Sequence, residues 1–405
     1  MVMDILTHYI RQSKNLRICK KMHHFILKNF GPIKDVDIKF GDLTILVGPQ
    51  ASGKSLTLEA LKLVIDRDHI INMLDRYNYI LGHDPKKILN NYFGEGMSSI
   101  WTDKTKMEYD GKSFSLTAVP KKAASNPDET MFYIPAQRIM SISDGRPKNF
   151  MEFDNSSPYV LRMFSETLRL FMQNGLGHSN ILFPIDTRLK HGMKRSFNES
   201  IFHNAKIIME ERYGQKKMVL NVDNMSVPFM SWSAGQKEFM PLLLAFYCLS
   251  GPPSKVVKKE KYKYVVIEEP EMGLHPKAIV SIILQILELM QNGYKVILTT
   301  HTPVILEFAW AFNYISKNRE QFTKAICDLF GVEETSSVGH LLSGVSNKVI
   351  RTYFFELGKG MHKAISKDIS NLDVSAEDSE IADWGGLSSF SSVASEIVSK
   401  YGLYE

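Results

Sequence analysis

The segment LTILVGPQASGKSLTLEALKL, residues 43–63, constrains the fold more than any other part of this 405-residue chain. Its first five residues are mostly apolar and predict a buried strand, and the glycine-bearing residues that follow predict a tight loop. The continuation SLTLEALKLVI is apolar on most faces and predicts a helix packed inside an α/β sandwich. A strand, loop and helix in this order favour an α/β fold.

The loop has the spacing G-x-x-x-x-G-K-[ST], completed by Gly48, Gly53, Lys54 and Ser55. Glycines allow backbone N–H groups to surround a β-phosphate, and the helix N-terminus adds positive potential. Lys54 would place a charge on the β- and γ-phosphates, and the Ser55 hydroxyl would bind Mg²⁺. The sequence therefore predicts ATP and Mg²⁺ as ligands, and the flanking strand and helix argue against a chance match. The residues expected to bind the nucleotide here are Gly48, Pro49, Gln50, Ala51, Ser52, Gly53, Lys54, Ser55 and Leu56.

Two more apolar strands, YVVIEE and KVILTT, are predicted on either side of the helix AIVSIILQILELMQNG. This order implies a right-handed parallel crossover. The first strand ends in Glu268, which we expect near Mg²⁺, and Glu269, which could polarise a water against the γ-phosphate. The second ends in Thr300 and His301, and His301 is expected to reach the γ-phosphate and the attacking water. The alternatives are a solvated strand end for the glutamates and a structural hydrogen bond for the histidine.

The segment SWSAGQKEF predicts a helix start, with Ser233 as N-cap and Gln236 at the spacing of a capping box. Gly235 would let the backbone approach a ligand closely. A capped helix with a Ser-Ala-Gly edge is a good anion site, so we expect Ser233, Gly235 and Gln236 to contact the γ-phosphate held by a second subunit. A plain helix cap is the alternative. Pro241 predicts a helix that is kinked or starts late.

Together, GPQASGKS, WSAGQ, VVIEEP and TTH resemble the motifs of ABC-type ATPase heads, with WSAGQ in the place of their signature motif LSGGQ. The resemblance implies an ABC-type P-loop ATPase head, a mixed-sheet sandwich with an inserted helical and β lid segment, which pairs head to tail around ATP. YIPAQRIM stands where such heads carry a Q-loop, so the resemblance implies Gln137 near Mg²⁺. Arg138 beside it is a candidate phosphate or interface contact. The implied metal set is Ser55, Gln137 and Glu268.

The fuller wording, from residue 25 to about residue 310, resembles bacterial stand-alone ATPases of the OLD-like, AAA_15/AAA_21-type group. These include the ATPase subunits of the PARIS and Septu anti-phage systems. The resemblance implies a separate effector, a nuclease of Toprim or HNH type, and a phage protein as trigger. Two features depart from the resemblance, because Glu268 replaces the more usual Asp and the C-terminal tail is too short for the Toprim domain of OLD nucleases. We therefore expect ATP hydrolysis without intrinsic nuclease activity.

The sequence predicts three successive segments. Residues 1–22 are expected to be an N-terminal extension, residues 23–330 an ABC-type ATPase domain, and residues 331–405 a small helical region for partner docking. Within the ATPase domain, residues of about 70–230 are expected to contain the lid and the signature motif. There is no sustained heptad repeat, which argues against a long coiled-coil arm.

Composition excludes few classes of protein. No run of about 18 apolar residues occurs, so no transmembrane helix is expected. Cys19, Cys248 and Cys327 are scattered, which argues against a disulfide framework or a zinc site and favours a reducing, cytoplasmic compartment. The net charge of +5, from 49 basic and 44 acidic residues, is too small to establish nucleic-acid binding.

The leading hypothesis is an ATP-dependent homo-oligomeric switch, with no membrane contact, that controls an effector in antiviral defence. The alternative is an ATPase similar to SMC and break-repair heads that acts directly on DNA, and a transporter ATPase is the weakest reading. Two basic stretches, TRLKHGMKR and KVVKKEKYK, could contact nucleic-acid phosphates or could be solvated surface. The cations of the first stretch are Arg188, Lys190, Lys194 and Arg195.

Overall fold

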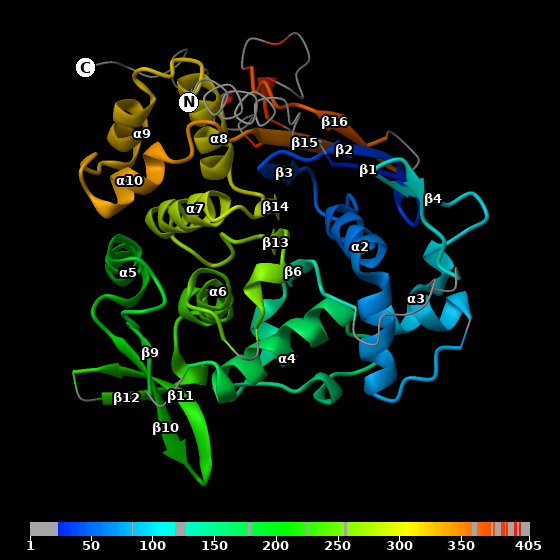
Figure 1. Cartoon of the computed structure of the whole chain (residues 1–405), viewed down its shortest axis with the longest axis horizontal. Helices are drawn as coiled ribbons and strands as arrows, with labels where there is room; N and C mark the ends of the chain where they lie inside the picture. Colours follow the sequence, from blue (N-terminus) through cyan, green and yellow to red (C-terminus); the bar gives the residue numbers. More distant parts are fainter. Residues whose placement is uncertain are drawn as a thin grey trace, which may run out of the picture.

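The computed structural model describes residues 23–82, 84–117, 127–176, 180–223, 225–254, 257–358 and 363–373, together with residues 376, 382–384, 386, 387, 393, 394 and 397. The predicted N-terminal extension, residues 1–22, lies outside the described residues. The described part combines a large mixed sheet with helices on both faces (Figure 1). The α/β fold class predicted from the sequence is therefore confirmed.

The main sheet has ten strands in the order β5-β4-β1-β2-β16-β15-β3-β14-β13-β6. Neighbours from β15 through β3, β14 and β13 to β6 pair in parallel, whereas β1 pairs antiparallel with both β2 and β4. The bounds of these strands are β1 His24–Phe30, β2 Ile33–Lys39, β3 Leu43–Val47, β4 Lys106–Tyr109, β5 Lys112–Ser113, β6 Met131–Ile134, β13 Tyr264–Glu268, β14 Lys295–Thr299, β15 Ile350–Leu357 and β16 Ala364–Asp368.

Two hydrophobic cores lie on opposite faces of this sheet, because successive side chains of a strand point to opposite sides. In β3, Ile45 and Val47 belong to one core and Leu46 to the other. Figure 1 shows α2 on one face and α6 and α7 on the other. The α-helices are α2 Lys54–Arg76, α3 Pro85–Phe93, α4 Tyr159–Asn174, α5 His191–Phe197, α6 Ala234–Ser250, α7 Pro276–Gln291, α8 Pro303–Ile315, α9 Phe322–Phe330 and α10 Ser337–Ser343.

The strands of residues 70–230, the segment expected to contain a lid insert, are divided among three sheets. β4, β5 and β6 extend the main sheet, whereas a separate antiparallel sheet has the order β12-β11-β10-β9. β7 and β8 form a third, two-stranded sheet. The remaining strands are β7 Ile142–Ser143, β8 Arg146–Pro147, β9 Ile181–Phe183, β10 Lys206–Arg212, β11 Gln215–Val222 and β12 Met225–Pro228, and the short helical turns are η1 Met97–Ile100, η2 Arg138–Ser141, η3 Phe150–Glu152, η4 Asn198–Phe202, η5 Phe229–Ser231 and η6 Lys259–Lys261.

Local sequence patterns explain several of these elements. β4 and β5 form a hairpin across Asp110 and Gly111, whose φ angles of 52° and 74° are those of a tight left-handed turn. The amphipathic helix α4 ends at Gly175. β13 and β14 pair in parallel, with α7 as the crossover between them.

The C-terminal region differs from the sequence prediction. We expect residues 331–405 to be helical, but this is wrong for two segments, because β15 and β16 are strands of the main sheet. β15 lies directly beside β3, so the sheet is continuous across the expected domain boundary at residue 330. Apolar residues of β15 such as Phe354 and Phe355 are buried, one in each of the two cores.

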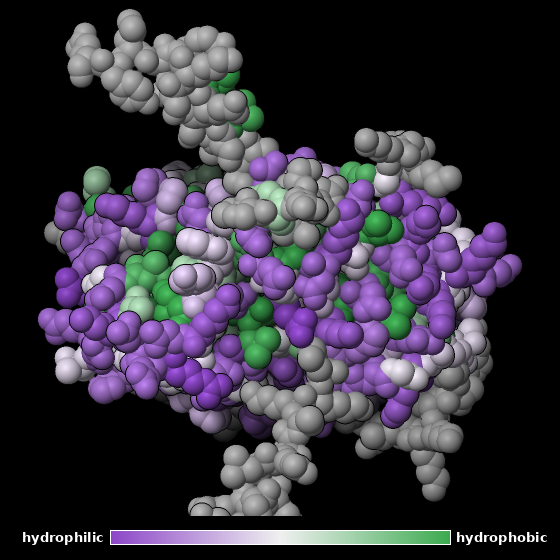
Figure 2. All heavy atoms as spheres, turned by 90° about the horizontal axis from the view of Figure 1, so that it is seen from above, coloured by the Kyte–Doolittle hydropathy of each residue, from purple (hydrophilic) through white to green (hydrophobic). Residues whose placement is uncertain are grey.

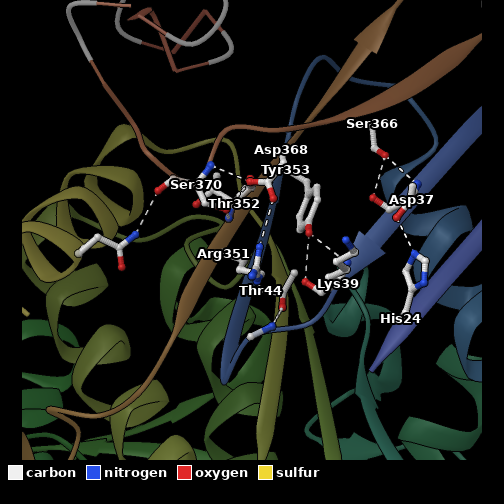
Figure 3. Close-up of polar contacts among 12 residues, drawn as sticks. His24, Asp37, Lys39, Thr44, Arg351, Thr352, Tyr353, Ser366, Asp368 and Ser370 are labelled. Atoms are coloured by element: carbon white, nitrogen blue, oxygen red, sulfur yellow. Dashed lines mark hydrogen bonds and ion pairs between the residues drawn. The ribbon is translucent and has the colours of Figure 1, made fainter. Parts of the chain in front are cut away.

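Polar contacts fix β15 and β16 against the N-terminal strands (Figure 3). The Tyr353 hydroxyl accepts from the Lys39 N–H at 3.0 Å and donates to the Lys39 carbonyl at 3.1 Å. Ser366 accepts from the Asp37 N–H at 2.9 Å. These contacts join segments more than 300 positions apart in sequence. The C-terminal strands are therefore part of the main fold rather than an appendage to it.

A buried charge cluster fastens α2 to β6. The ammonium of Lys62, which is 1% exposed, lies 2.7 Å from Asp66 and 2.6 Å from Glu129, and donates to the Met131 carbonyl at 2.6 Å. Asp66 also accepts from the N–H groups of Thr130 and Met131. Because each charge is paired and hydrogen-bonded, burial is tolerated, and removing one partner would leave an unpaired buried ion. The helix that follows the glycine loop is thus fixed to the edge of the sheet.

The face seen from above in Figure 2 is mostly hydrophilic, with hydrophobic side chains in small separate groups. Within the described residues, every helix is too short or too polar to cross a bilayer.

The position of β15 predicts that its core residues stabilise the whole domain. Phe355 is 0% exposed, and replacing it by Ala would remove its packing and leave a cavity. We expect Phe355→Ala to lower the free energy of unfolding by about 3–5 kcal/mol in chemical denaturation. Val349→Ala, at a half-exposed position just before the same strand, is the control and should change it by less than about 0.5 kcal/mol. Equal effects would contradict the assignment of β15 to the core.

Candidate nucleotide-binding and hydrolysis site

Four neighbouring parallel strands bring the predicted motifs to one edge of the sheet. The order β3-β14-β13-β6 places their carboxyl ends side by side. The glycine loop follows β3, His301 follows β14, Glu269 follows β13 and Gln137 follows β6. In open α/β sheets ligands bind at this edge. Residues separated by more than 200 positions in the sequence are thus gathered at one site.

The loop of residues 48–55, called here the phosphate loop, requires unusual backbone angles. Gly48 has φ 144°, Ala51 has φ 59°, and Gly53, the N-cap of α2, has φ 85°. A side chain at Gly48 would also meet the Phe355 carbonyl of β15 at 2.6 Å. Gly48 is therefore needed for the strand packing as well as for the loop. Of the other predicted contacts, Pro49, Gln50, Ala51 and Ser55 are exposed, Ser52 is buried and Leu56 is half-buried.

Lys54 lies folded over the phosphate loop. Its ammonium donates to the carbonyls of Gly48 at 2.8 Å and Pro49 at 2.7 Å. Burial lowers the pKa of Lys54 to about 8, while the negative charges of Glu269 and Glu268 act in the opposite direction. These charge effects indicate that Glu268, the last residue of β13, and Glu269, which follows it, lie near this ammonium. An anionic phosphate chain would stabilise the charged form.

Glu268 and Ser55 form the part of the site that fits a divalent cation. Glu268 is 3% exposed and accepts from the Ala136 N–H at 3.1 Å through Oε2. Its Oε1 is buried without a hydrogen-bond partner. Burial raises the pKa of Glu268, and the Ser55 hydroxyl is the largest influence that lowers it. A carboxylate oxygen with no partner beside a serine hydroxyl is the donor chemistry that Mg²⁺ takes from a protein.

Glu269 and His301, the predicted catalytic pair, lie next to each other. Glu269 Oε1 is 3.5 Å from His301 Nε2, and both side chains are about 30% exposed. Glu269 has φ 43°, an unfavourable angle for a residue with a side chain, and its N–H donates to both oxygens of Thr299 at 3.1 Å. Strain of this kind is found where a side chain is aimed at a functional position. The carboxylate is thus held at the end of β13 within reach of the histidine.

A third acid, Glu271, belongs to the site and was not singled out by sequence reasoning. Its Oε1 accepts from the Thr300 hydroxyl at 2.7 Å and from the His301 N–H at 2.6 Å. Burial raises its pKa, and these two donors counteract the increase. Glu271 therefore fixes the backbone that carries His301. Glu271 is the last residue of the sequence EEPE, but only the fold shows that it faces the end of β14.

Glu59 is a further acid that the sequence did not indicate. It lies four residues after Ser55, one helical turn along the same face of α2. Burial and the nearby charge of Glu268 raise its pKa well above the usual range. The cation side of the site is thus surrounded by more carboxyl groups than the motifs suggest.

Gln137 and Arg138 have different environments, although they are adjacent. Gln137 is exposed and follows Ala136, whose N–H binds Glu268, so its backbone is held near the predicted metal position. Arg138 was a candidate phosphate or interface contact, and this prediction is wrong. It is 0% exposed, and its guanidinium donates to the carbonyls of Glu268 and Glu269 at 3.0 and 3.1 Å.

The start of α6 has the capping box predicted from its sequence. The Ser233 hydroxyl accepts from the Gln236 N–H at 3.3 Å, and the Gln236 side chain accepts from the Ser233 N–H at 3.2 Å. Residues 233–235, called here the signature edge, begin the helix with Ser233 exposed. Of the two alternatives predicted from Pro241, a kink or a late start, the late start is wrong, because α6 begins at Ala234 and contains Pro241 in its interior.

Gly235 packs against the loop that follows β13. A side chain there would meet the carbonyl of Gly273 at 2.6 Å, and Gly273 itself has φ 72°. The sequence explains Gly235 by close approach to a ligand. The structure provides a second reason, because the signature edge touches residues 268–275, called here the acidic loop.

Each cation of the basic stretch at residues 188–195 has a partner within the chain, although the side chains of Arg195 and its partner Glu199 are 74% and 61% exposed. Arg188 is 8% exposed and donates to the carbonyls of Gly175 and Pro252. Lys190 lies 3.5 Å from Glu288, Lys194 pairs with Asp186, and Arg195 lies 2.7 Å from Glu199. A cation that already has an acidic partner gains less from a nucleic-acid phosphate.

Sequence comparison identifies ATPase domains in two consecutive parts of the chain. Residues 21–136 match the family profile described as "AAA ATPase domain", and residues 141–307 match the one described as "AAA domain, putative AbiEii toxin, Type IV TA system". The chain carries an ATPase domain of the AAA type. The first match contains the phosphate loop, and the second contains the signature edge, the acidic loop and His301. No curated protein matches the sequence.

Three solved structures are similar to the chain at low sequence identity. An SMC head domain from Thermotoga maritima has 11% identity and a TM-score of 0.37 over 86% of this chain and 98% of that one. An SmcHead bound to the C-winged helix domain of ScpA has 12% identity and a TM-score of 0.39 over 85% and 96%. An ATP-binding subunit of an ABC transporter has 15% identity and a TM-score of 0.30 over 68% and 79%.

The pKa of Lys54 predicts how nucleotide affinity depends on pH. Because the phosphates favour the charged ammonium, ATP binding above pH 8 requires Lys54 to take up a proton. The apparent dissociation constant of ATP should therefore rise by about tenfold between pH 7 and pH 9, measured by calorimetry. Lys54→Arg keeps its charge throughout this range and should bind without that dependence. A wild-type affinity that stays constant to pH 9 would contradict the prediction.

The contact at Gly235 predicts a separation of binding from turnover. Gly235→Ala would push the first turn of α6 away from Gly273 but would leave the phosphate loop untouched. We expect ATP affinity to remain within about twofold and the hydrolysis rate to fall by about tenfold or more, because small displacements of reacting groups are costly. Lys237→Ala, in the same turn, is the control and should retain the rate. Unchanged hydrolysis in Gly235→Ala would refute the role given to this contact.

Proposed function

We propose that the protein is an ATP-hydrolysing switch that closes head to tail as a homo-oligomer around ATP and thereby controls a separate effector. One observation supports the proposal above all: the phosphate loop and the signature edge are both exposed. Pro49, Gln50 and Ser55 are open to solvent on the loop, and Ser233 is open on the edge. The phosphate loop and the signature edge both lie at a helix N-terminus, which favours phosphate. The signature edge of one copy can therefore complete the nucleotide site of another.

In this proposal, the residues of one copy bind and orient the nucleotide. The phosphate loop and Lys54 hold the phosphate chain, while Ser55, Gln137 and Glu268 hold Mg²⁺, which would neutralise phosphate charge. Glu269 accepts a proton from the attacking water, and His301, 3.5 Å away, orients that carboxylate and the water. The edge of the partner copy excludes solvent from the γ-phosphate. Hydrolysis removes the group that bridges the copies, so the assembly reopens.

The effector and the biological setting are further parts of the proposal. The motif wording resembles the ATPase subunits of PARIS and Septu, and the profile matched over residues 141–307 carries the name of the AbiEii toxin of a type IV toxin–antitoxin system. From the motif resemblance we infer a role in defence against phage, with a nuclease of Toprim or HNH type as the effector and a phage protein as the trigger. Direct action on DNA is less favoured, because the cations at residues 188–195 have internal partners.

Glu269→Gln tests the switch. The amide cannot accept a proton from water but has nearly the same size, so ATP should bind normally and remain unhydrolysed. We expect turnover to fall by about a hundredfold or more and the closed assembly to accumulate with ATP and Mg²⁺, detected as an increase in mass by analytical ultracentrifugation.

Ser233→Arg in the Glu269→Gln background provides the matched control. It places a large charged side chain on the signature edge without touching the phosphate loop, so ATP binding should persist and the mass increase should disappear. An assembly that forms equally well with Arg at this position, or a lone subunit that hydrolyses ATP at full speed, would refute the proposal.

A further inference from the structure

Arg138 is one of the two largest fully buried side chains within the described residues, together with Arg162. Its three donor nitrogens point to three different carbonyls. Nη1 donates to Glu268 at 3.0 Å, Nη2 to Glu269 at 3.1 Å and Nε to Glu238 at 3.1 Å. Burying a guanidinium is costly, and these three carbonyl partners offset part of that cost.

The partners of Arg138 belong to parts of the site that are remote in sequence. Glu268 and Glu269 begin the acidic loop, about 130 positions after Arg138. Glu238 lies in the second turn of α6, one turn after the signature edge. A single planar group therefore connects the segment carrying Gln137, the backbone of Glu268 and Glu269, and the helix capped by Ser233.

The charge of Arg138 has a second role in this arrangement. Four glutamates surround it, namely Glu238, Glu268, Glu269 and Glu271, and all four raise its pKa against the lowering effect of burial. The carboxylate of Glu238 lies 3.9 Å from Nε. Arg138 thus holds together carboxylates that would otherwise repel one another.

A contact independent of Arg138 joins the same two elements. Gly235 of the signature edge lies so close to Gly273 of the acidic loop that a methyl group does not fit between them. Two attachments within the first two turns of α6, at Gly235 and Glu238, restrict its rotation relative to the acidic loop. Because α6 is attached to the acidic loop at two points, the two elements move together.

We propose that Arg138 is a positioning residue that joins the acidic loop and the signature edge into one rigid unit. Movement of the catalytic acids around a bound nucleotide then moves the edge that the same chain presents to its neighbour. The nucleotide bound in one copy would therefore affect the position of its signature edge at the nucleotide site of the next copy. The inference rests on the proposed function, because it gives that switch its internal connection.

Only arginine has the geometry for this connection. The arginine guanidinium is planar and presents N–H donors in three directions. The lysine ammonium is a compact point charge on a shorter side chain. Arg138→Lys keeps the charge that balances the glutamates but cannot contact three carbonyls in the same places. The substitution therefore removes the connection more selectively than a neutral residue would.

Arg162→Lys supplies the matched control. Arg162 is also 0% exposed, and its guanidinium bonds to the Tyr79 hydroxyl at 2.9 Å and to the Asn91 carbonyl, away from the phosphate loop, the acidic loop and the signature edge. It should lose a similar amount of thermal stability. We expect Arg138→Lys to reduce kcat for ATP by about tenfold or more with ATP affinity within about threefold, whereas Arg162→Lys keeps both values. Equal kinetic effects in the two variants, at matched folding, would overturn the proposal.

A measurement inside one subunit separates this inference from the proposed function. In Ser233→Arg protein, which should not assemble, amide hydrogen exchange is followed in residues 234–243 with and without ATP and Mg²⁺. Binding should slow exchange there when Arg138 is present and have no effect after Arg138→Lys. If ATP leaves exchange unchanged with Arg138 in place, or changes it equally in both proteins, the connection does not exist. If the connection is present but wild-type protein neither assembles nor hydrolyses ATP, only the proposed function fails.

Discussion

The parallel alignment of β3, β14, β13 and β6 is the constraint on which the rest of the site depends. In a parallel sheet, neighbouring strands end at the same edge, so residues that follow them are brought together whatever their separation in the sequence. The phosphate loop, His301, the acidic loop and Gln137 occupy that edge in this order. β15 supports the arrangement from the other side, because its backbone lies against Gly48.

This gathering creates an electrostatic problem that the fold resolves with two buried cations. Glu268 and Glu271 have raised pKa values because they are withdrawn from water. Arg138 donates hydrogen bonds to the backbone of the acidic loop. Lys54 interacts electrostatically with Glu268 and Glu269. Glu268 Oε1 is buried and has no hydrogen-bond partner. A cation bound at this oxygen would balance its negative charge. This arrangement of charges fits the proposed binding of a metal ion and a phosphate chain.

In the proposed switch, the same contacts would link ATP hydrolysis to movement of the signature edge. α6 is fastened to the acidic loop at Gly235 and at Glu238, while its capped start faces solvent. A helix held in this way can present its N-terminus to a neighbouring copy without losing its position relative to the catalytic acids. In the proposed switch, binding energy would pass between copies through packed backbone, with no long flexible element required.

The sequence by itself determined the short-range features of this protein. The phosphate loop, the capping box at Ser233, the hairpin at Asp110 and the strands ending in Glu268 and Thr300 depend on residues that are near one another along the chain, and local patterns specify them. Tertiary structure decided the rest. Arg138 looked like a phosphate contact but is buried among backbone carbonyls, the tail expected to be helical contributes two strands to the sheet, and Glu271 turns toward a different strand. The physical reason is that pairing partners and burial arise between distant segments, which no local pattern records.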